Sequence, residues 1–341
     1  MLATIPETAI RTTAGHVSDL LEHALEHTSA QRALIVADSD CELSRALTAA
    51  YRQSLPDARF VEFDAAAPDA IRPVLEEYGA GDLVILIQST SFRLHAFRIR
   101  LELFRRGLKV VEHPHLERMP GAQALIYLES LAYDPEYYRG TGHALKQRLD
   151  QASEGILETA GARLNYPAGF EPAKLNIGDY SALPNTGGQF PIGEVFTESR
   201  ELTAVHGSVR ISHFGDTAFR VNQPATPITL VVEGGRVVET RDSTPEFDAV
   251  LALIREGEGE VWLRELGLGL NRAFSPTRVV SDIGTFERMC GVHLSLGSKH
   301  ATYNKPEIRK KAARYHVDVF AATSAVLIDG ESLFSDGGWT V

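Results

Sequence analysis

The chain has 341 residues, of which 44% are hydrophobic and 23% charged, and its formal net charge is −11. This length allows two domains, each with its own core, and the composition is that of a folded globular protein rather than a disordered or fibrous one. An acidic surface repels phosphate groups, so the charge argues against nucleic acid as a partner and, more weakly, against anionic membranes.

The ends and the cysteines carry little sign of export or of a membrane. The first 14 residues lack the basic start and apolar core of a signal peptide, and no apolar run approaches the ~20 residues that span a bilayer. The two cysteines, Cys41 and Cys290, are far apart, which argues against a disulfide framework and fits a reducing compartment. The sequence therefore predicts a cytoplasmic protein with no membrane partner.

The first half alternates between helix and strand patterns. We expect helices over residues 14–26, 42–54, 68–79 and 92–107, and strands over 32–37, 58–63, 82–88 and 108–113. Such alternation predicts an α/β domain with a Rossmann-like parallel sheet, which we place at residues 1–167. The loop after the first strand has neither G-x-G-x-x-G nor a P-loop, so the pattern indicates a fold and no nucleotide.

The second half has a different pattern of residues. A helical pattern over residues 133–161 leads into it, and turn residues become dense from about residue 168. Short alternating strands are expected over 203–211, 217–222, 228–233 and 236–240, with Gly234-Gly235 as a hairpin turn. Residues 247–256 and 259–266 suggest helical or mixed structure, and two strands fit between 316 and 333. These patterns predict an α+β domain over 168–341 with a largely antiparallel sheet.

One pair of residues in the second half has metal-ligand spacing. In a strand, residues two apart point to the same face, so His316 and Asp318 would project side by side. That arrangement suits two ligands of one metal, or one ligand on each of two adjacent metals. The plainer alternative is a solvent-facing polar pair on an edge strand.

Four more residues are candidates that local sequence alone does not decide. Glu194, after a Gly-containing turn, suits either a ligand or a surface acid. Glu265 lies among apolar and small residues, where burial is costly unless a cation such as Arg264 or a metal pairs with it. His293 lies in an apolar run and is either a core residue or a ligand, and His300 is a base, an anion binder or exposed.

Other motifs are weaker. Glu112-His113-Pro114-His115 has metal-binding residue types but ends a strand of the other half, where a loop is expected. The apolar surroundings of Cys290 favour an inert core thiol. Neither G-x-S-x-G nor H-E-x-x-H occurs, so serine hydrolase and zincin mechanisms have no support.

The order of the segments resembles a known family. The runs GEVFTE, VEGGRVVE, RELGLGLN, GVHLSLG and HVDV follow one another as in the metal-binding half of the aminopeptidase T family. These are two-domain, dinuclear-metal aminopeptidases of leucyl type. The resemblance covers residues 184–330, and the first half resembles that family only in its alternation of helices and strands.

The resemblance implies a full set of metal ligands. The residues that match the family's ligands are Glu194, Glu265, His293, His316 and Asp318. Such a set implies two divalent ions, zinc, cobalt or manganese, with Glu265 bridging them. It also implies a hydrolase in which metal-activated water attacks the amide carbonyl of a peptide or small-molecule substrate. Members of the family are often dimers, so a homodimer is expected.

Two positions depart from the family's pattern. His300 stands where the family has a tyrosine near the reacting carbonyl, and Arg264 stands where it has a glycine. A histidine differs from tyrosine in pKa and reach, but it can donate a hydrogen bond to an oxyanion or shuttle a proton. Glu265 and His300 are therefore the expected catalytic residues.

Two alternatives stay open at this level. The chain also resembles the mononuclear iron enzyme 2,5-dihydroxypyridine 5,6-dioxygenase in the His-x-Asp pair and the GLGLN region. That enzyme uses two histidines and one carboxylate on iron and has a histidine at the position of Glu265, so the ligand pattern favours the hydrolase. The second alternative is a repurposed homologue that binds or tailors a peptide in a biosynthetic pathway, suggested by His300 and the short chain.

Overall fold

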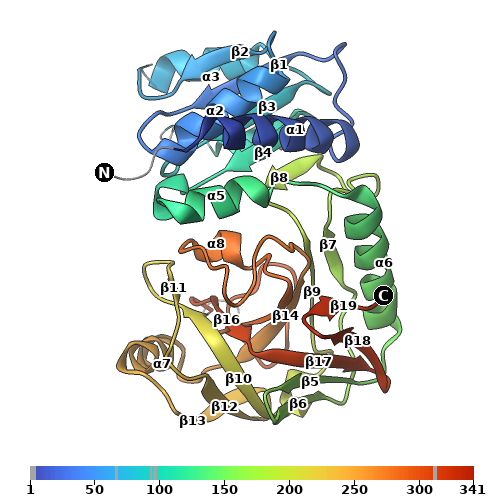
Figure 1. Cartoon of the computed structure of the whole chain (residues 1–341). Coiled ribbons are helices and arrows are strands. Elements are labelled where there is room, and N and C mark those ends of the chain that lie inside the picture. Colours follow the sequence, from blue (N-terminus) through green and yellow to red (C-terminus); the bar gives the residue numbers. More distant parts are fainter. Residues whose placement is uncertain (1–4, 66–67, 93, 95–97, 310–312) are drawn as a thin grey trace. The chain divides into compact units, whose positions relative to one another are not determined.

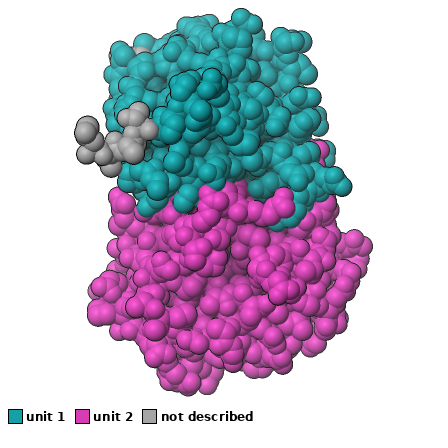
Figure 2. Space-filling model, viewed as in Figure 1, with its two compact units in different colours: residues 1–138, 178–192 teal, residues 139–177, 193–341 magenta. Residues whose placement is uncertain are grey.

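The computed structural model describes residues 5–65, 68–92, 94, 98–309 and 313–341. The chain divides into two compact units, one of residues 1–138 and 178–192 and the other of residues 139–177 and 193–341 (Figure 2). The domain boundary expected between residues 167 and 168 falls inside the second unit. Among the described residues, no helix is long and apolar enough to cross a membrane.

The first unit is built on a parallel sheet in the order β2-β1-β3-β4-β8 (Figure 1). Its strands are β1 (Ala33–Ala37), β2 (Arg59–Glu62), β3 (Leu83–Ile87), β4 (Lys109–His113) and β8 (Gly187–Gln189). Its helices are α1 (Glu7–His23), α2 (Glu42–Ser54), α3 (Pro68–Glu76), α4 (Ile99–Arg105) and α5 (Ala122–Glu129), with the 3-10 turn η1 (Leu116–Arg118). The predicted α/β domain with a parallel sheet is confirmed.

The helices cover both faces of this sheet. Leu34 of β1 and Val84 of β3 belong to one apolar cluster with Leu75 of α3 and Leu103 of α4. On the opposite face, the side chain of His113 at the end of β4 contacts tyrosines of α2 and α5. Every residue of β3 is buried, because a central parallel strand has helices on both sides.

Two helices of this unit differ from their predicted limits. The first helix begins at Glu7, about two turns before the expected residue 14. The helix expected over residues 92–107 is described only as α4, Ile99–Arg105, and residues 93 and 95–97 of that prediction lie outside the described residues. Helix α5 was not predicted.

The described residues of the second unit form a largely antiparallel sheet of 14 strands. Its main path runs β19-β18-β17-β5-β6-β10-β16-β15-β14-β9-β7, and β11, β12 and β13 join it through β10 and β12. The first strands are β5 (Gly155–Thr159), β6 (Ala162–Tyr166), β7 (Lys174–Asn176), β9 (Glu194–Glu198), β10 (His206–Gly215), β11 (Val221–Asn222), β12 (Ile228–Glu233) and β13 (Arg236–Arg241). The later ones are β14 (Leu263–Gly269), β15 (Gly291–Leu296), β16 (Val317–Ala321), β17 (Thr323–Ile328), β18 (Glu331–Ser335) and β19 (Gly338–Trp339).

The remaining helices are α6 (Pro135–Gln151), α7 (Pro245–Glu258) and α8 (Ile283–Phe286), with the 3-10 turn η2 (Leu202–Ala204). The predicted antiparallel sheet is confirmed. The β12–β13 hairpin turns at Gly234 and Gly235, both with positive φ, which is the conformation that a two-residue hairpin of this type requires.

Two segments were predicted wrongly. The helix expected over 133–161 ends at Gln151, and Gly155–Thr159 forms the strand β5 between β6 and β17. The segment 259–266, expected to be helical or mixed, leads into β14. All seven residues of β14 are buried, so the strand lacks the polar alternation by which a half-exposed strand is recognised.

Candidate metal centre

Four neighbouring strands, in the order β16-β15-β14-β9, carry most of the predicted ligands. Glu194 opens β9 and lies opposite Gly269 of β14, and His293 of β15 lies opposite Gly267 of β14. Directly opposed residues of an antiparallel pair project from the same face of the sheet. The register therefore brings Glu194 and His293 to one face, across a strand whose residues there have no side chain.

The missing side chain of Gly267 makes room for an imidazole. A Cβ at this position would lie 2.0 Å from Cε1 of His293, far inside contact distance. At Gly269, a Cβ would lie 1.9 Å from the carbonyl oxygen of Met289. The Gly-Leu-Gly run of β14 thus permits the close approach of the ring and of the neighbouring backbone.

Alternation along β14 puts Glu265 on the same face as Gly267 and Gly269, since the pairing with β9 is regular from Glu265 to Gly269. Leu263 pairs with Leu296 of β15, but the next paired residue of β14 is Leu266, so Arg264 and Glu265 together lie opposite one residue of β15. Bulges of this kind re-aim side chains and are common beside functional sites. The Glu265 carboxylate lies near Nε2 of His293 on this face, and the Arg264 guanidinium beside the bulge takes another partner.

The structure brings all the predicted ligands together in two groups that share one residue. The first group is Glu194, Glu265 and His293, and the second is Glu265, His316 and Asp318; within each, the ligand atoms lie within 4.8 Å of one another. Nε2 of His293 lies 3.3 Å from Oε1 of Glu194 and 3.3 Å from Oε1 of Glu265. Nε2 of His316 lies 3.0 Å from Oδ1 of Asp318.

Several atoms of these groups have the free electron pairs that a cation needs. Nδ1 of His316 lies 3.1 Å from the carbonyl oxygen of Lys299 and donates to it, which leaves Nε2 unprotonated in the neutral ring. Oδ1 of Asp318 is buried, lies 3.0 Å from Nε2 of His316, and makes no hydrogen bond of normal geometry among the residues that the structure describes. The donor set of carboxylates and imidazoles therefore fits divalent ions.

The charges of the cluster reinforce one another. Burial by itself would lower the pKa of His293, but the carboxylates of Glu194 and Glu265 raise it well above the ordinary value. Burial opposes charge on His316 too, yet Asp318 and Glu265 raise its pKa to about 10. Burial would raise the pKa of Glu265, but the facing histidines lower it. Bound cations would take the place of the protons on these imidazoles.

Arg288 is a neighbour of the cluster that the sequence did not reveal. Its Nη1 lies 3.1 Å from Oε2 of Glu194 and also contacts the carboxylate of Glu287. Its side chain is 7% exposed. The two oxygens of Glu194 thus have different partners, Oε2 facing Arg288 and Oε1 facing His293. Arg288 follows the short helix α8 with no pattern around it that marks a site.

His300 also joins the cluster. Its side chain is 2% exposed, and Nε2 lies 2.8 Å from Oε2 of Glu265. Nδ1 accepts hydrogen bonds from the backbone N–H groups of Thr302 and Tyr303, at 3.1 and 3.4 Å. The catalytic role expected for His300 stays a prediction.

Arg264 does not pair with Glu265. Its Nε and Nη2 lie 2.6 and 2.9 Å from the two carboxylate oxygens of Glu198, and both side chains are buried. The plain alternative for Glu265, a pair with Arg264, is therefore wrong, because Glu198 neutralises that guanidinium.

The weaker candidates lie elsewhere. His113 is buried in the first unit between the hydroxyls of Tyr51 and Tyr127, at 2.8 and 2.7 Å, so a structural role accounts for it. Nε2 of His115 lies 3.2 Å from the hydroxyl of Ser91. Cys290 is half-buried rather than part of the core.

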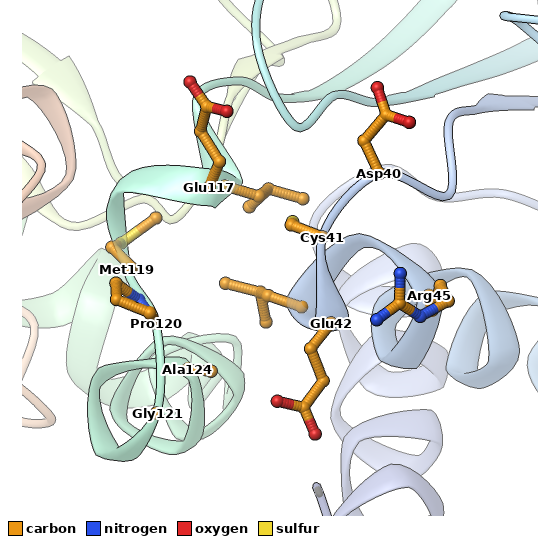
Figure 3. Close-up of a pocket in the computed structure, with 11 residues that line it drawn as sticks. Asp40, Cys41, Glu42, Arg45, Glu117, Met119, Pro120, Gly121 and Ala124 are labelled. Atoms are coloured by element: carbon orange, nitrogen blue, oxygen red, sulfur yellow. The ribbon is translucent and has the colours of Figure 1, made fainter. Parts of the chain in front are cut away.

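The first unit has a pocket of about 480 Å³ beside the start of α2 and the loop after β4 (Figure 3). Asp40, Glu42 and Glu117 line it together with Arg45. A group of acidic residues that shares Asp40 with the pocket, Asp38, Asp40 and Asp64, has two exposed members, and such groups are common without an ion. The pocket contains no residue predicted to be catalytic or to bind metal.

The fold and the cluster together define a protein with an α/β unit and an antiparallel-sheet unit that carries a metal-capable group of carboxylates and histidines. A scan against models of protein families found no match to the sequence, and a search of curated proteins found none either. Among solved structures, wild-type AmpT from Thermus thermophilus is similar, with a TM-score of 0.57 and 16% identity. The match covers 98% of this chain and 100% of that one.

The chain therefore has a fold that is distantly like that of aminopeptidase T. The structural likeness extends well beyond residues 184–330, where the sequence motifs lie. At this identity the likeness concerns the fold, and the chemistry has to be argued from the site.

Proposed function

We propose that this protein is a metal-dependent hydrolase resembling aminopeptidase T, which cleaves an amide or peptide bond with metal-activated water. The observation that carries the proposal is the pair of ligand groups that share Glu265. Three carboxylates and two imidazoles on one face of a sheet suit two neighbouring divalent ions, zinc, cobalt or manganese. When bound, such ions polarise a carbonyl and lower the pKa of water.

The chain's own residues would prepare the site in stated ways. Glu265 would contribute to both ion positions, as the shared member of the two groups. Arg288 would fix Oε2 of Glu194 and leave Oε1 for an ion. The Lys299 carbonyl would hold His316 in the tautomer that binds through Nε2. These contacts orient the ligands before any substrate arrives.

The ligand composition supports the hydrolase over the iron dioxygenase. Each of the two groups holds one histidine and two carboxylates. An iron centre with two histidines and one carboxylate would have to draw its ligands from both groups. A homodimeric assembly, a cytoplasmic location and a peptide or small-molecule substrate stay predictions.

Elemental analysis of the purified full chain tests the proposal. About two zinc, cobalt or manganese ions per chain, together with release of amino acids from short peptides, would support it. His316→Ala and Asp318→Ala should each lower metal content and activity, whereas His206→Ala, at an exposed histidine of the same unit, should change neither. One iron per chain with oxygen uptake would favour the dioxygenase, and no metal after reconstitution would favour a binding protein.

A further inference from the structure

The loop of residues 297–303 contacts two of the predicted ligands through consecutive residues. The carbonyl oxygen of Lys299 accepts the Nδ1 hydrogen of His316. Nε2 of His300 lies 2.8 Å from Oε2 of Glu265. The loop thus contacts both the shared carboxylate of Glu265 and the imidazole of His316.

The backbone of this loop decides which nitrogen of His300 carries hydrogen. The N–H groups of Thr302 and Tyr303 both point at Nδ1, and a nitrogen that accepts a hydrogen bond has a free electron pair. The neutral ring must then carry its hydrogen on Nε2. This nitrogen lies 2.8 Å from Oε2 of Glu265, and the hydrogen that it carries prevents it from binding an ion.

The ring of His300 has little freedom to turn away. Its centroid lies 5.0 Å from that of Tyr303, 6.0 Å from that of His316 and 6.3 Å from that of Phe196. Since the side chain is 2% exposed, a different rotamer would have to displace these rings. The contact with Glu265 is therefore a fixed feature of the site.

Arg264 forms hydrogen bonds with the loop on both sides of His300. Its Nη1 donates to the carbonyl of Ser298 at 2.6 Å, and Nη2 donates to the carbonyl of Tyr303 at 3.1 Å. Glu198 holds the same guanidinium through both carboxylate oxygens. The two positions at which the sequence departs from the aminopeptidase T pattern, Arg264 and His300, thus belong to one network of contacts.

We propose that His300 is a positioning residue for Glu265. The close contact of its Nε2 with Oε2 of the carboxylate keeps Oε1 directed toward His293 and the ion position beside it. This inference rests on the proposed metal site. It assigns His300 a role in metal affinity, whereas a residue that only assists the substrate would affect turnover and leave metal binding unchanged.

Isothermal titration of the metal-free full chain with Zn²⁺ tests the role. His300→Ala should bind zinc about tenfold to a hundredfold more weakly than the wild type, the usual effect of removing a group that orients a ligand. His300→Gln should stay within a few-fold of the wild type, because its amide nitrogen can donate from the place of Nε2. His206→Ala is the matched control. Wild-type affinity in His300→Ala would overturn the inference.

The tautomer gives a second test that needs no metal. Nitrogen-15 spectra of the imidazoles in the metal-free protein should show His300 with hydrogen on Nε2, and hydrogen on Nδ1 would overturn the inference whatever the variants do. If the wild type binds no zinc while the Nε2–H tautomer is found, the proposed hydrolase fails and the contact with Glu265 stands. If the wild type binds zinc and the tautomer is the other one, only the role of His300 fails.

Discussion

At the scale of single residues, the site depends on Gly267, which has no side chain and so leaves room for the ring of His293. Gly267→Ala would place a Cβ 2.0 Å from the ring of His293, which must then leave its position between Glu194 and Glu265. We expect a loss of roughly 1–3 kcal/mol in unfolding free energy, as for other overpacked cores, together with weaker zinc binding. Denaturant unfolding and zinc titration measure the two effects.

Gly338→Ala is the matched control, because a Cβ there meets no atom within 4 Å. It should keep both the stability and the zinc affinity of the wild type. If Gly267→Ala also kept both, the close packing of His293 against β14 would not be a requirement of the site.

The predicted ligands could be recognised one residue at a time, since their types and order resemble a known family. Their spatial grouping could not, because it depends on the pairing of β9 and β15 with β14. Arg288 was missed for the same reason: only the fold brings its guanidinium to Glu194. The direction of His300 depends on backbone N–H groups of its loop, which no residue pattern encodes.

At the scale of elements, the sequence predicted strands correctly where the run of apolar residues or the turn between two strands is distinct. The buried run of β3 and the Gly-Gly hairpin of β12 and β13 were predicted close to their observed limits. Strand β14 was not, because all of its residues are buried, so it lacks the apolar and polar alternation by which a half-exposed strand is recognised. Its regular pairing with β9 is what puts Glu265 on the face of the cluster.

Contacts between elements of the first unit give a prediction about pH. The carbonyl of Phe190 accepts from Tyr127, whose oxygen accepts from Nδ1 of His113, so Nε2 of His113 accepts from Tyr51. Burial lowers the pKa of His113 to about 3 in the folded protein, from about 6.5 when unfolded. The unfolded chain therefore binds more protons between these values, and stability falls as pH falls below 6.5.

The contribution of His113 is complete above pH 6.5 and decreases toward pH 3, with a slope of at most about 1.4 kcal/mol per pH unit. Urea unfolding between pH 5 and 8 should show this slope in the wild type and a smaller one in His113→Gln, which cannot take up the proton. Equal slopes in the two proteins would mean that His113 is not held neutral by its tyrosine partners.

At the scale of the whole molecule, the division into two units predicts where a metal acts. All of the predicted ligands, and His300, lie within residues 193–341 of the second unit. An ion that binds only the folded state stabilises it by about 2.7 kcal/mol when its concentration is 100 times Kd.

Hydrogen exchange with and without Zn²⁺ should therefore show slower exchange in peptides from β9, β14, β15 and β16. Peptides from β1, β3 and β4 of the first unit should exchange at the same rate in both conditions. His316→Ala should reduce the difference, most of all in peptides from β16, since one of the two groups loses its only imidazole. Zinc protection confined to the first unit, or protection that His316→Ala leaves at its full wild-type extent, would contradict the predicted site.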